Sequence, residues 1–244
     1  MHKNTIWITE RGDPAYDLSW LPYAIKKMPG IIITKSPGII YNILKNFHIK
    51  NVIVHSTITG MGATQIEPNV CDTKTAIHYT SKLIAYLGDE KVVLRIDPII
   101  PCNENINIII KEILCKLITK PRIRISFMDQ YCHVRERLNK IGITLPWKGL
   151  HAPILLRKRY FAKLQKAYPA WNIETCAEPG FDSSNIGCIS LFDCNVLQVP
   201  IEKQTKQQRN GCKCFGNKFE VLKSPQQCLH ACLYCYWKID NINV

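Results

Sequence analysis

Six short apolar runs, rich in isoleucine and valine, alternate along this chain with segments of helical periodicity. The runs lack the alternation of apolar and polar residues seen in half-solvated strands, so each predicts a strand buried on both faces. Such strands alternating with helices predict a parallel α/β sheet that is covered on both faces. The predicted strands are 5–9, 30–34, 51–57, 91–96, 122–127 and 172–176, and the predicted helices are 16–28, 37–47, 73–87, 104–118, 130–141 and 155–168.

Six strand–helix units in roughly 175 residues favour a full or partial parallel (β/α) barrel over an open nucleotide-binding fold. Polar and glycine-rich turns follow most of the predicted strands. Because the carboxyl ends of parallel strands meet at one mouth, these turns predict a ligand site there, although ordinary strand-to-helix turns are the simpler interpretation of each one. We expect residues 1–200 to form the barrel and residues 201–244 a cysteine-rich segment packed on its mouth.

The charge balance is strongly basic, with 32 Lys and Arg against 19 Asp and Glu and a formal net charge of +13. This excess attracts polyanions, so DNA, RNA or a nucleotide is an expected partner, although a lysine-rich background composition would give the same count. No apolar run approaches the roughly 18 residues of a spanning helix, and the first residues lack the apolar stretch of a secretion signal. We therefore expect a cytoplasmic protein with no membrane partner.

The chain has twelve cysteines. Thiols stay reduced in the cytoplasm, so ligation of a metal or a cluster is their expected role. Cys228, Cys232 and Cys235 follow the pattern CxxxCxxC, and Tyr234 precedes the third cysteine. Three thiolates at this spacing can hold three corners of a cubic iron–sulfur cluster and leave the fourth iron open to a small molecule. A zinc site is the competing interpretation, although zinc favours four ligands, commonly in CxxC pairs.

Four further cysteines precede this motif and could ligate an auxiliary iron–sulfur cluster. They are Cys176, Cys188, Cys212 and Cys214. The alternative is that Cys212 and Cys214 only line the first cluster.

The CxxxCxxC motif with its aromatic residue resembles the signature of the radical S-adenosylmethionine (SAM) superfamily. The resemblance implies a [4Fe-4S] cluster whose open iron is chelated by the amino and carboxylate groups of SAM. It also implies an electron donor, reductive cleavage of SAM, and a 5′-deoxyadenosyl radical that abstracts hydrogen from a substrate.

The position of the motif departs from that superfamily, in which it usually lies near the first barrel strand. Its place near the end of this sequence resembles the family called domain of unknown function 1848. The likeness covers nearly the whole chain, at 11–14, 34–37, 57–62, 67–69, 95–99, 126–131, 176–178 and the terminal cysteines. A circularly permuted barrel would bring the motif beside the N-terminal strand.

Under this resemblance, Arg11, Gly12 and Asp13 correspond to the stretch that holds the SAM amino group, with Asp13 accepting its ammonium. Arg95 and Asp97 are candidates for contact with the SAM carboxylate or ribose, and a buried Arg–Asp pair closing the mouth is the alternative. The other candidates are Thr59, Gly60 and Tyr234 for cofactor binding, and Tyr131 as a catalytic radical relay, with aromatic packing as the default for both tyrosines.

The expected function is therefore that of a radical SAM enzyme that modifies or repairs a substrate, with nucleic acid or a nucleotide as the favoured class. The alternative is a non-catalytic zinc- or iron–sulfur-containing protein that binds nucleic acid. The enzyme requires a pocket for SAM and an exposed iron, whereas the binding protein requires neither.

Overall fold

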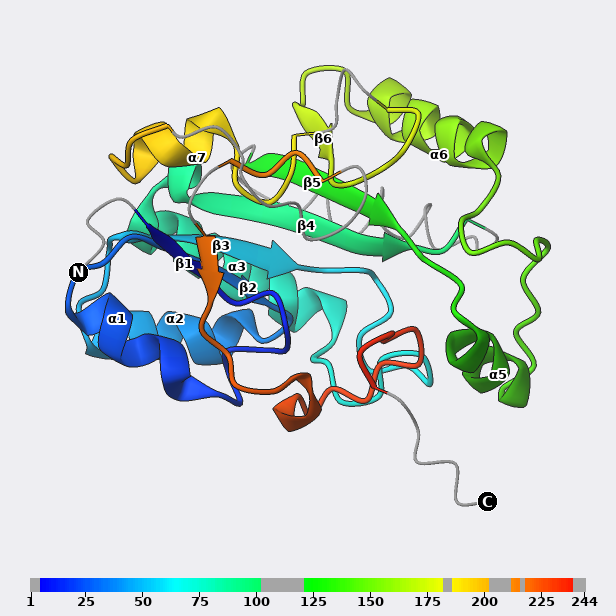
Figure 1. Cartoon of the computed structure of the whole chain (residues 1–244), viewed down its shortest axis with the longest axis horizontal. Coiled ribbons are helices and arrows are strands. Elements are labelled where there is room, and N and C mark those ends of the chain that lie inside the picture. Colours follow the sequence, from blue (N-terminus) through cyan, green and yellow to red (C-terminus); the bar gives the residue numbers. More distant parts are fainter. Residues whose placement is uncertain (1–4, 102–120, 182–185, 202–211, 216–217, 239–244) are drawn as a thin grey trace.

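The computed structural model describes residues 5–101, 121–181, 186–201, 212–215 and 218–238. Within these ranges, seven strands form one parallel sheet in the order β6-β5-β4-β3-β2-β1-β7 (Figure 1). The strands are β1 (Ile6–Ile8), β2 (Gly30–Thr34), β3 (Val52–Thr57), β4 (Val92–Ile99), β5 (Arg122–Phe127), β6 (Ile173–Thr175) and β7 (Lys218–Glu220). The predicted parallel α/β sheet is confirmed, and all six predicted strands are present.

Among the described helices, four follow predicted segments closely, the first is shorter than predicted, and the last was not predicted. The helices are α1 (Leu21–Ile25), α2 (Pro37–Asn46), α3 (Thr73–Leu87), α5 (Cys132–Lys140), α6 (Ile154–Ala167) and α7 (Leu191–Val196). The predicted helix 16–28 is instead a short 3-10 helix, Leu18–Trp20, followed by α1. It begins only after Asp17, which caps it, and it ends before Lys27, whose φ of 57° is left-handed. The predicted helix 104–118 lies outside the described residues.

Both faces of the sheet are covered, as the continuous apolar strands predict. Trp7, Ile32 and Val54 face helices α1, α2 and α3, whereas Ile8 and Ile53 pack against α7 and the cysteine-bearing loops. Figure 1 shows α1 and α2 on one side of the sheet and α7 on the other. The polar loops that follow these strands are therefore attached to a well-packed sheet.

The contact between β1 and β2 depends on a glycine. A Cβ atom on Gly30 would lie 1.9 Å from the indole ring of Trp7. Trp7 is fully buried, and its Nε1 donates to the carbonyl of Met28 at 2.9 Å. The glycine thus lets β2 pair with β1 under this large side chain.

The C-terminal strand β7 was not predicted, and it pairs in parallel with β1. Ile6 lies opposite Lys218, and Ile8 lies opposite Glu220. The pairing leads the chain from β7 into the CxxxCxxC motif next to the loop that follows β1. Strands β6 and β7 form the two edges of the sheet among the described residues.

In the part of the chain that the structure describes, no helix has both the length and the apolar character needed to cross a bilayer.

Candidate functional site

A cavity of about 590 Å³ lies at the carboxyl ends of the strands. Its lining includes Lys35 after β2, Thr57 at the end of β3, Phe127 at the end of β5 and Cys176 after β6. The cavity therefore lies where the carboxyl ends of the strands were predicted to meet.

Most of the predicted site residues line this single cavity. They are Arg11, Gly12, Asp13, Arg95, Asp97, Tyr131, Tyr234 and all seven cysteines of the two predicted groups. Thr59 and Gly60 are exceptions, because neither belongs to the lining. Thr59 is buried and donates its hydroxyl to Glu67 at 2.6 Å, so its role is to hold a neighbouring side chain.

The terminal motif places three thiols on the cavity wall. Cys232 is buried, whereas Cys228 and Cys235 are half-buried. Burial raises the pKa of Cys232 to about 12. A bound metal can overcome such a shift, since coordination deprotonates a thiol outright. Among the described residues, these three sulfurs do not form a set whose members all lie within 4.8 Å of one another.

His230, inside the motif, anchors the terminal segment to the loop after β1. Its Nε2 lies 2.8 Å from Asp13 Oδ2, and both side chains are almost completely buried. The Asp13 carboxylate also accepts hydrogen bonds from Thr34 Oγ1 (2.9 Å), the Lys35 amide (2.7 Å) and the Ala15 amide (2.9 Å). A carboxylate has about four acceptor positions, so these contacts fill it and leave no place for a ligand ammonium.

Tyr234, before the third cysteine, is fixed by the loop after β3. Its hydroxyl donates to the buried Glu67, and the ammonium of Lys35 lies 5.3 Å from its ring centre and 3.0 Å from Glu67. The backbone adds two bonds between the same segments, from Leu233 to Ile66 and from Asn69 to His230. In Figure 1 the red terminal loop lies beside the cyan loop that follows β3.

The other four cysteines form a buried row that packs in a different cluster from Cys232 and Cys235. Cys176 Sγ lies 3.3 Å from Cys188 Sγ, and the Cys188 amide donates to Cys214 Sγ at 3.0 Å. The thiol of Cys214 is in turn hydrogen-bonded to that of Cys212. We call this set the four-cysteine row; all four members are at most 6% exposed.

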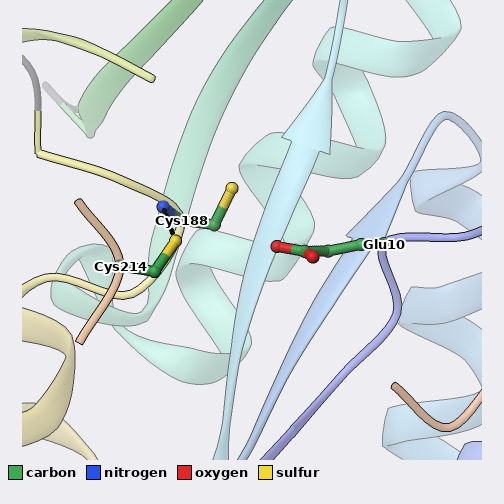
Figure 2. A group of neighbouring side chains, drawn as sticks. All are labelled: Glu10, Cys188 and Cys214. Carbon is green, nitrogen blue, oxygen red and sulfur yellow. Dashed lines mark hydrogen bonds between the residues drawn. The ribbon is translucent and has the colours of Figure 1, made fainter. Parts of the chain in front are cut away.

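Glu10, at the end of β1, completes the surroundings of the row. Its carboxylate points toward Cys188 and Cys214, and the ligand atoms of these three residues lie within 4.8 Å of one another (Figure 2). Burial raises the pKa of Glu10 to about 7, although Lys218 Nζ lies 2.9 Å from Oε1. Sequence analysis missed Glu10, and its charge directly after a buried strand was the available signal.

Cations surround the four-cysteine row. Arg95 Nη1 lies 3.3 Å from Cys188 Sγ, and the fully buried Arg124 donates to the carbonyl of Cys188 at 3.1 Å. A hydrogen bond from Cys176, together with the guanidinium of Arg95, holds the pKa of Cys188 well below its usual value. A hydrogen bond from Cys214 lowers the pKa of Cys212 to about 5. The surroundings of Cys188 and Cys212 therefore favour the thiolate form of these two sulfurs.

Arg95 and Asp97 form the ion pair that sequence analysis gave as one of two alternatives. Arg95 Nε donates to Asp97 Oδ2 at 2.8 Å, and both residues line the cavity. The Asp97 side chain keeps an exposed fraction of 26%. The pair thus joins the four-cysteine row to the open part of the cavity.

Exposed aromatic rings gather at the mouth. Tyr131 and Tyr236 stack with their ring centres 5.5 Å apart, and Trp237 lies 5.1 Å from Tyr236. The guanidinium of Arg11 lies 5.6 Å from the centre of Trp237. All four residues belong to the lining of the cavity.

No curated protein and no solved structure matches this chain. The family model described as Domain of unknown function (DUF1848) matches residues 20–237, which include β2 to β7 and the whole terminal cysteine motif. The chain therefore belongs to the DUF1848 family.

Proposed function

We propose that this protein is a radical SAM enzyme whose terminal cysteines hold a [4Fe-4S] cluster. The observation that carries the proposal is the shared cavity: Cys228, Cys232 and Cys235 face it together with Arg11 and Asp97. A cavity of about 590 Å³ is within the range of small-molecule sites, so it can admit a ligand of the size of SAM.

The donor set fits a cluster with one open corner. Cys228, Cys232 and Cys235 provide three thiols, and their sulfurs are spread more widely than a group within 4.8 Å of one another. A single ion requires a compact ligand set, whereas a cluster is held through different iron atoms. When bound, such a cluster supplies an electron for the reductive cleavage of SAM, and an external donor must restore it.

The residues of the chain position this chemistry. His230 and Tyr234 fix the loop that carries the thiols, through Asp13 and Glu67. Because Asp13 is filled by protein contacts, we assign it to this anchoring role. We assign the polar contacts of SAM to Arg95 and Asp97, since both line the cavity together with the two cysteine groups.

The fold supports a permuted version of a radical SAM barrel. Strand β7 precedes the cysteine motif and pairs with β1, whose following loop carries Arg11, Gly12 and Asp13. This order in space is the one expected if the cluster-bearing unit has moved from the start of the sequence to its end. We propose a partial barrel on this basis.

The aromatic mouth supports a planar substrate such as a nucleobase in a nucleotide or nucleic acid. Tyr131, Tyr236 and Trp237 are exposed, and stacking on such rings is the usual means of holding a base. The formal charge of +13 would attract a phosphate backbone. Tyr131 then serves substrate binding, and a relay of the radical remains its proposed further role. The reduced thiols and the cluster fit a reducing cytoplasm.

Anaerobic reconstitution with iron and sulfide, followed by dithionite and SAM, tests the enzyme. We expect release of 5′-deoxyadenosine, which chromatography detects. Colourless protein that holds stoichiometric zinc and leaves SAM intact would contradict the proposal and would favour the non-catalytic alternative. Titration of DNA and RNA against salt tests the substrate class, because contacts with phosphate weaken steeply as salt rises.

A further inference from the structure

The four-cysteine row is assembled from three separate segments. Cys176 follows β6, Cys188 precedes α7, and Cys212 and Cys214 precede β7. None of these cysteines forms a disulfide. Packing alone accounts poorly for four thiols in mutual contact, because a single buried thiol already behaves as a small apolar side chain.

The loops that carry the row are built for close approach. Gly187 has a φ of +80°, and a Cβ atom at this position would lie 2.6 Å from the Cys214 amide nitrogen. The segment before Cys188 can therefore touch the segment around Cys214 only because residue 187 is glycine. The conformation of the two loops therefore brings the thiols of Cys188 and Cys214 together.

The shape of the row argues against one tetrahedral ion. Zinc with sulfur ligands at about 2.3 Å places every pair of sulfurs about 3.8 Å apart. Here Cys188 and Cys214 are central, and they share their compact group with Glu10 among the described residues. Cys176 and Cys212 extend the row on either side, each through contact with one central thiol. Four sulfurs in an extended arrangement fit a larger, multinuclear centre.

The polar surroundings fit an anionic centre held by thiolates. The Cys188 amide and Arg95 Nη1 both direct N–H groups at sulfur atoms, and such bonds tune iron–sulfur clusters. Arg124 and Lys218 add positive charge beside them.

His55 gives an independent indication of a missing group. Its ring is fully buried, and neither ring nitrogen has a hydrogen-bond partner among the described residues. The ring lies within electrostatic reach of Cys188 and Arg95. Buried nitrogens normally have partners, so an acceptor bound beside the row would satisfy one of them.

We propose that Cys176, Cys188, Cys212 and Cys214 ligate a second iron–sulfur cluster in the wall of the cavity. None of its ligands belongs to the CxxxCxxC motif, so the proposal does not depend on cleavage of SAM. Glu10 borders the cluster, and Arg95 lies between it and Asp97 in the open part of the cavity.

The test removes the terminal site and asks what remains. The C228A/C232A/C235A variant of the full chain, reconstituted anaerobically, is analysed for iron, acid-labile sulfide and zinc, and by electron paramagnetic resonance after reduction. We expect it to retain iron and sulfide together with a cluster signal. Adding Cys188→Ala to this variant should remove the iron, the sulfide and the cluster signal. Adding Cys194→Ala should not, because Cys194 is equally buried but lies outside the row.

Each other outcome overturns the second cluster. A folded triple variant without iron and sulfide overturns it, and so does stoichiometric zinc in place of iron. If the triple variant does not fold, Mössbauer spectra of the wild-type protein decide: two cluster environments support the proposal, and one environment contradicts it. Failure of SAM cleavage by the reconstituted wild-type protein, together with a cluster retained in the triple variant, would contradict the proposed function alone.

Discussion

The two cysteine groups share one cavity but are built differently. The terminal motif is a single loop of eight residues from Cys228 to Cys235, in which Cys228 and Cys235 are half-buried. Its own His230 and Tyr234 fix it to Asp13 and Glu67. The four-cysteine row joins three distant segments, is buried throughout, and rests on fixed cations such as Arg124. The terminal motif offers three thiols, which would leave one iron open to a small molecule. The four-cysteine row offers four thiols, which would leave no iron open. The comparison predicts one open and one closed centre.

The largest expected effect comes from the open centre. Cys232→Ala removes one of its three proposed ligands, so release of 5′-deoxyadenosine should fall to background. Cys188→Ala removes a proposed ligand of the closed centre and should lower iron content while SAM cleavage persists. Both are measured by chromatography and by iron analysis on the same anaerobic samples. Equal loss of cleavage in the two variants would break the distinction between the centres.

We expect the buried ion pairs of Arg124, beside the four-cysteine row, to contribute strongly to the free energy of unfolding. Arg124→Met leaves Glu174 without its buried partner, since Arg124 Nε lies 3.0 Å from Glu174 Oε2. It also removes the more distant of the two arginines beside Asp193, whose carboxylate lies 3.7 Å from Arg124 Nη2 and 2.7 Å from Arg122 Nη2. Breaking a buried pair in this way lowers the free energy of unfolding by about 3–5 kcal/mol. Urea denaturation measures it.

Arg135→Met is the matched control for this experiment. Arg135 bonds to Gln130 Oε1 and to the Lys148 carbonyl near the surface. We expect a loss of about 1 kcal/mol or less. Similar losses of unfolding free energy in Arg124→Met and Arg135→Met would show that the buried ion pairs beside the four-cysteine row contribute no more than surface contacts.

The anchoring of the terminal motif should give a smaller effect. His230→Phe removes the ring nitrogen that faces Asp13 and leaves that buried carboxylate one partner short. We expect a loss of about 1–3 kcal/mol in the free energy of unfolding and weaker retention of iron by the terminal motif. His230→Gln, which keeps a polar group, should recover part of both. Unchanged iron retention in His230→Phe would remove the anchoring role.

An exposed helix cap outside the lining of the cavity sets the scale. Asp72 caps α3 by accepting from the Thr75 amide at 3.0 Å, and its contacts with Thr75 lower its pKa. Asp72→Ala should cost about 1 kcal/mol at neutral pH without altering either centre. A lowered pKa gives stability that is present above the unfolded value of about 3.9 and is lost as the pH falls through the folded value. Thermal unfolding at pH 7 and pH 3 checks this, and a difference that does not shrink in acid contradicts it.

The sheet could be predicted from sequence because its strands are continuous apolar runs. Strand β7 could not, since its three residues, Lys218, Phe219 and Glu220, are only half-buried and lie at an edge. The first helical segment begins at Leu18 and not at residue 16, because the side chain of Asp17 caps it there.

The cysteines were predictable from their number and spacing, but their partners were not. Glu67 reaches Tyr234 from a loop more than 160 positions earlier in the chain, and His230 reaches Asp13 across 217 positions. Such contacts depend on the pairing of β7 with β1, which no local pattern reveals. The same pairing brings the loop that carries Asp13 beside the segment that carries His230.

Binding of SAM to an open iron is most directly tested by electron–nuclear double resonance of the reduced protein. The cofactor carries ¹⁵N in its amino group and ¹⁷O in its carboxylate. We predict hyperfine coupling of both labels to the cluster in the wild-type protein and in Cys188→Ala, with none in Cys232→Ala. A reduced, intact terminal cluster that shows no coupling to either label would contradict the account.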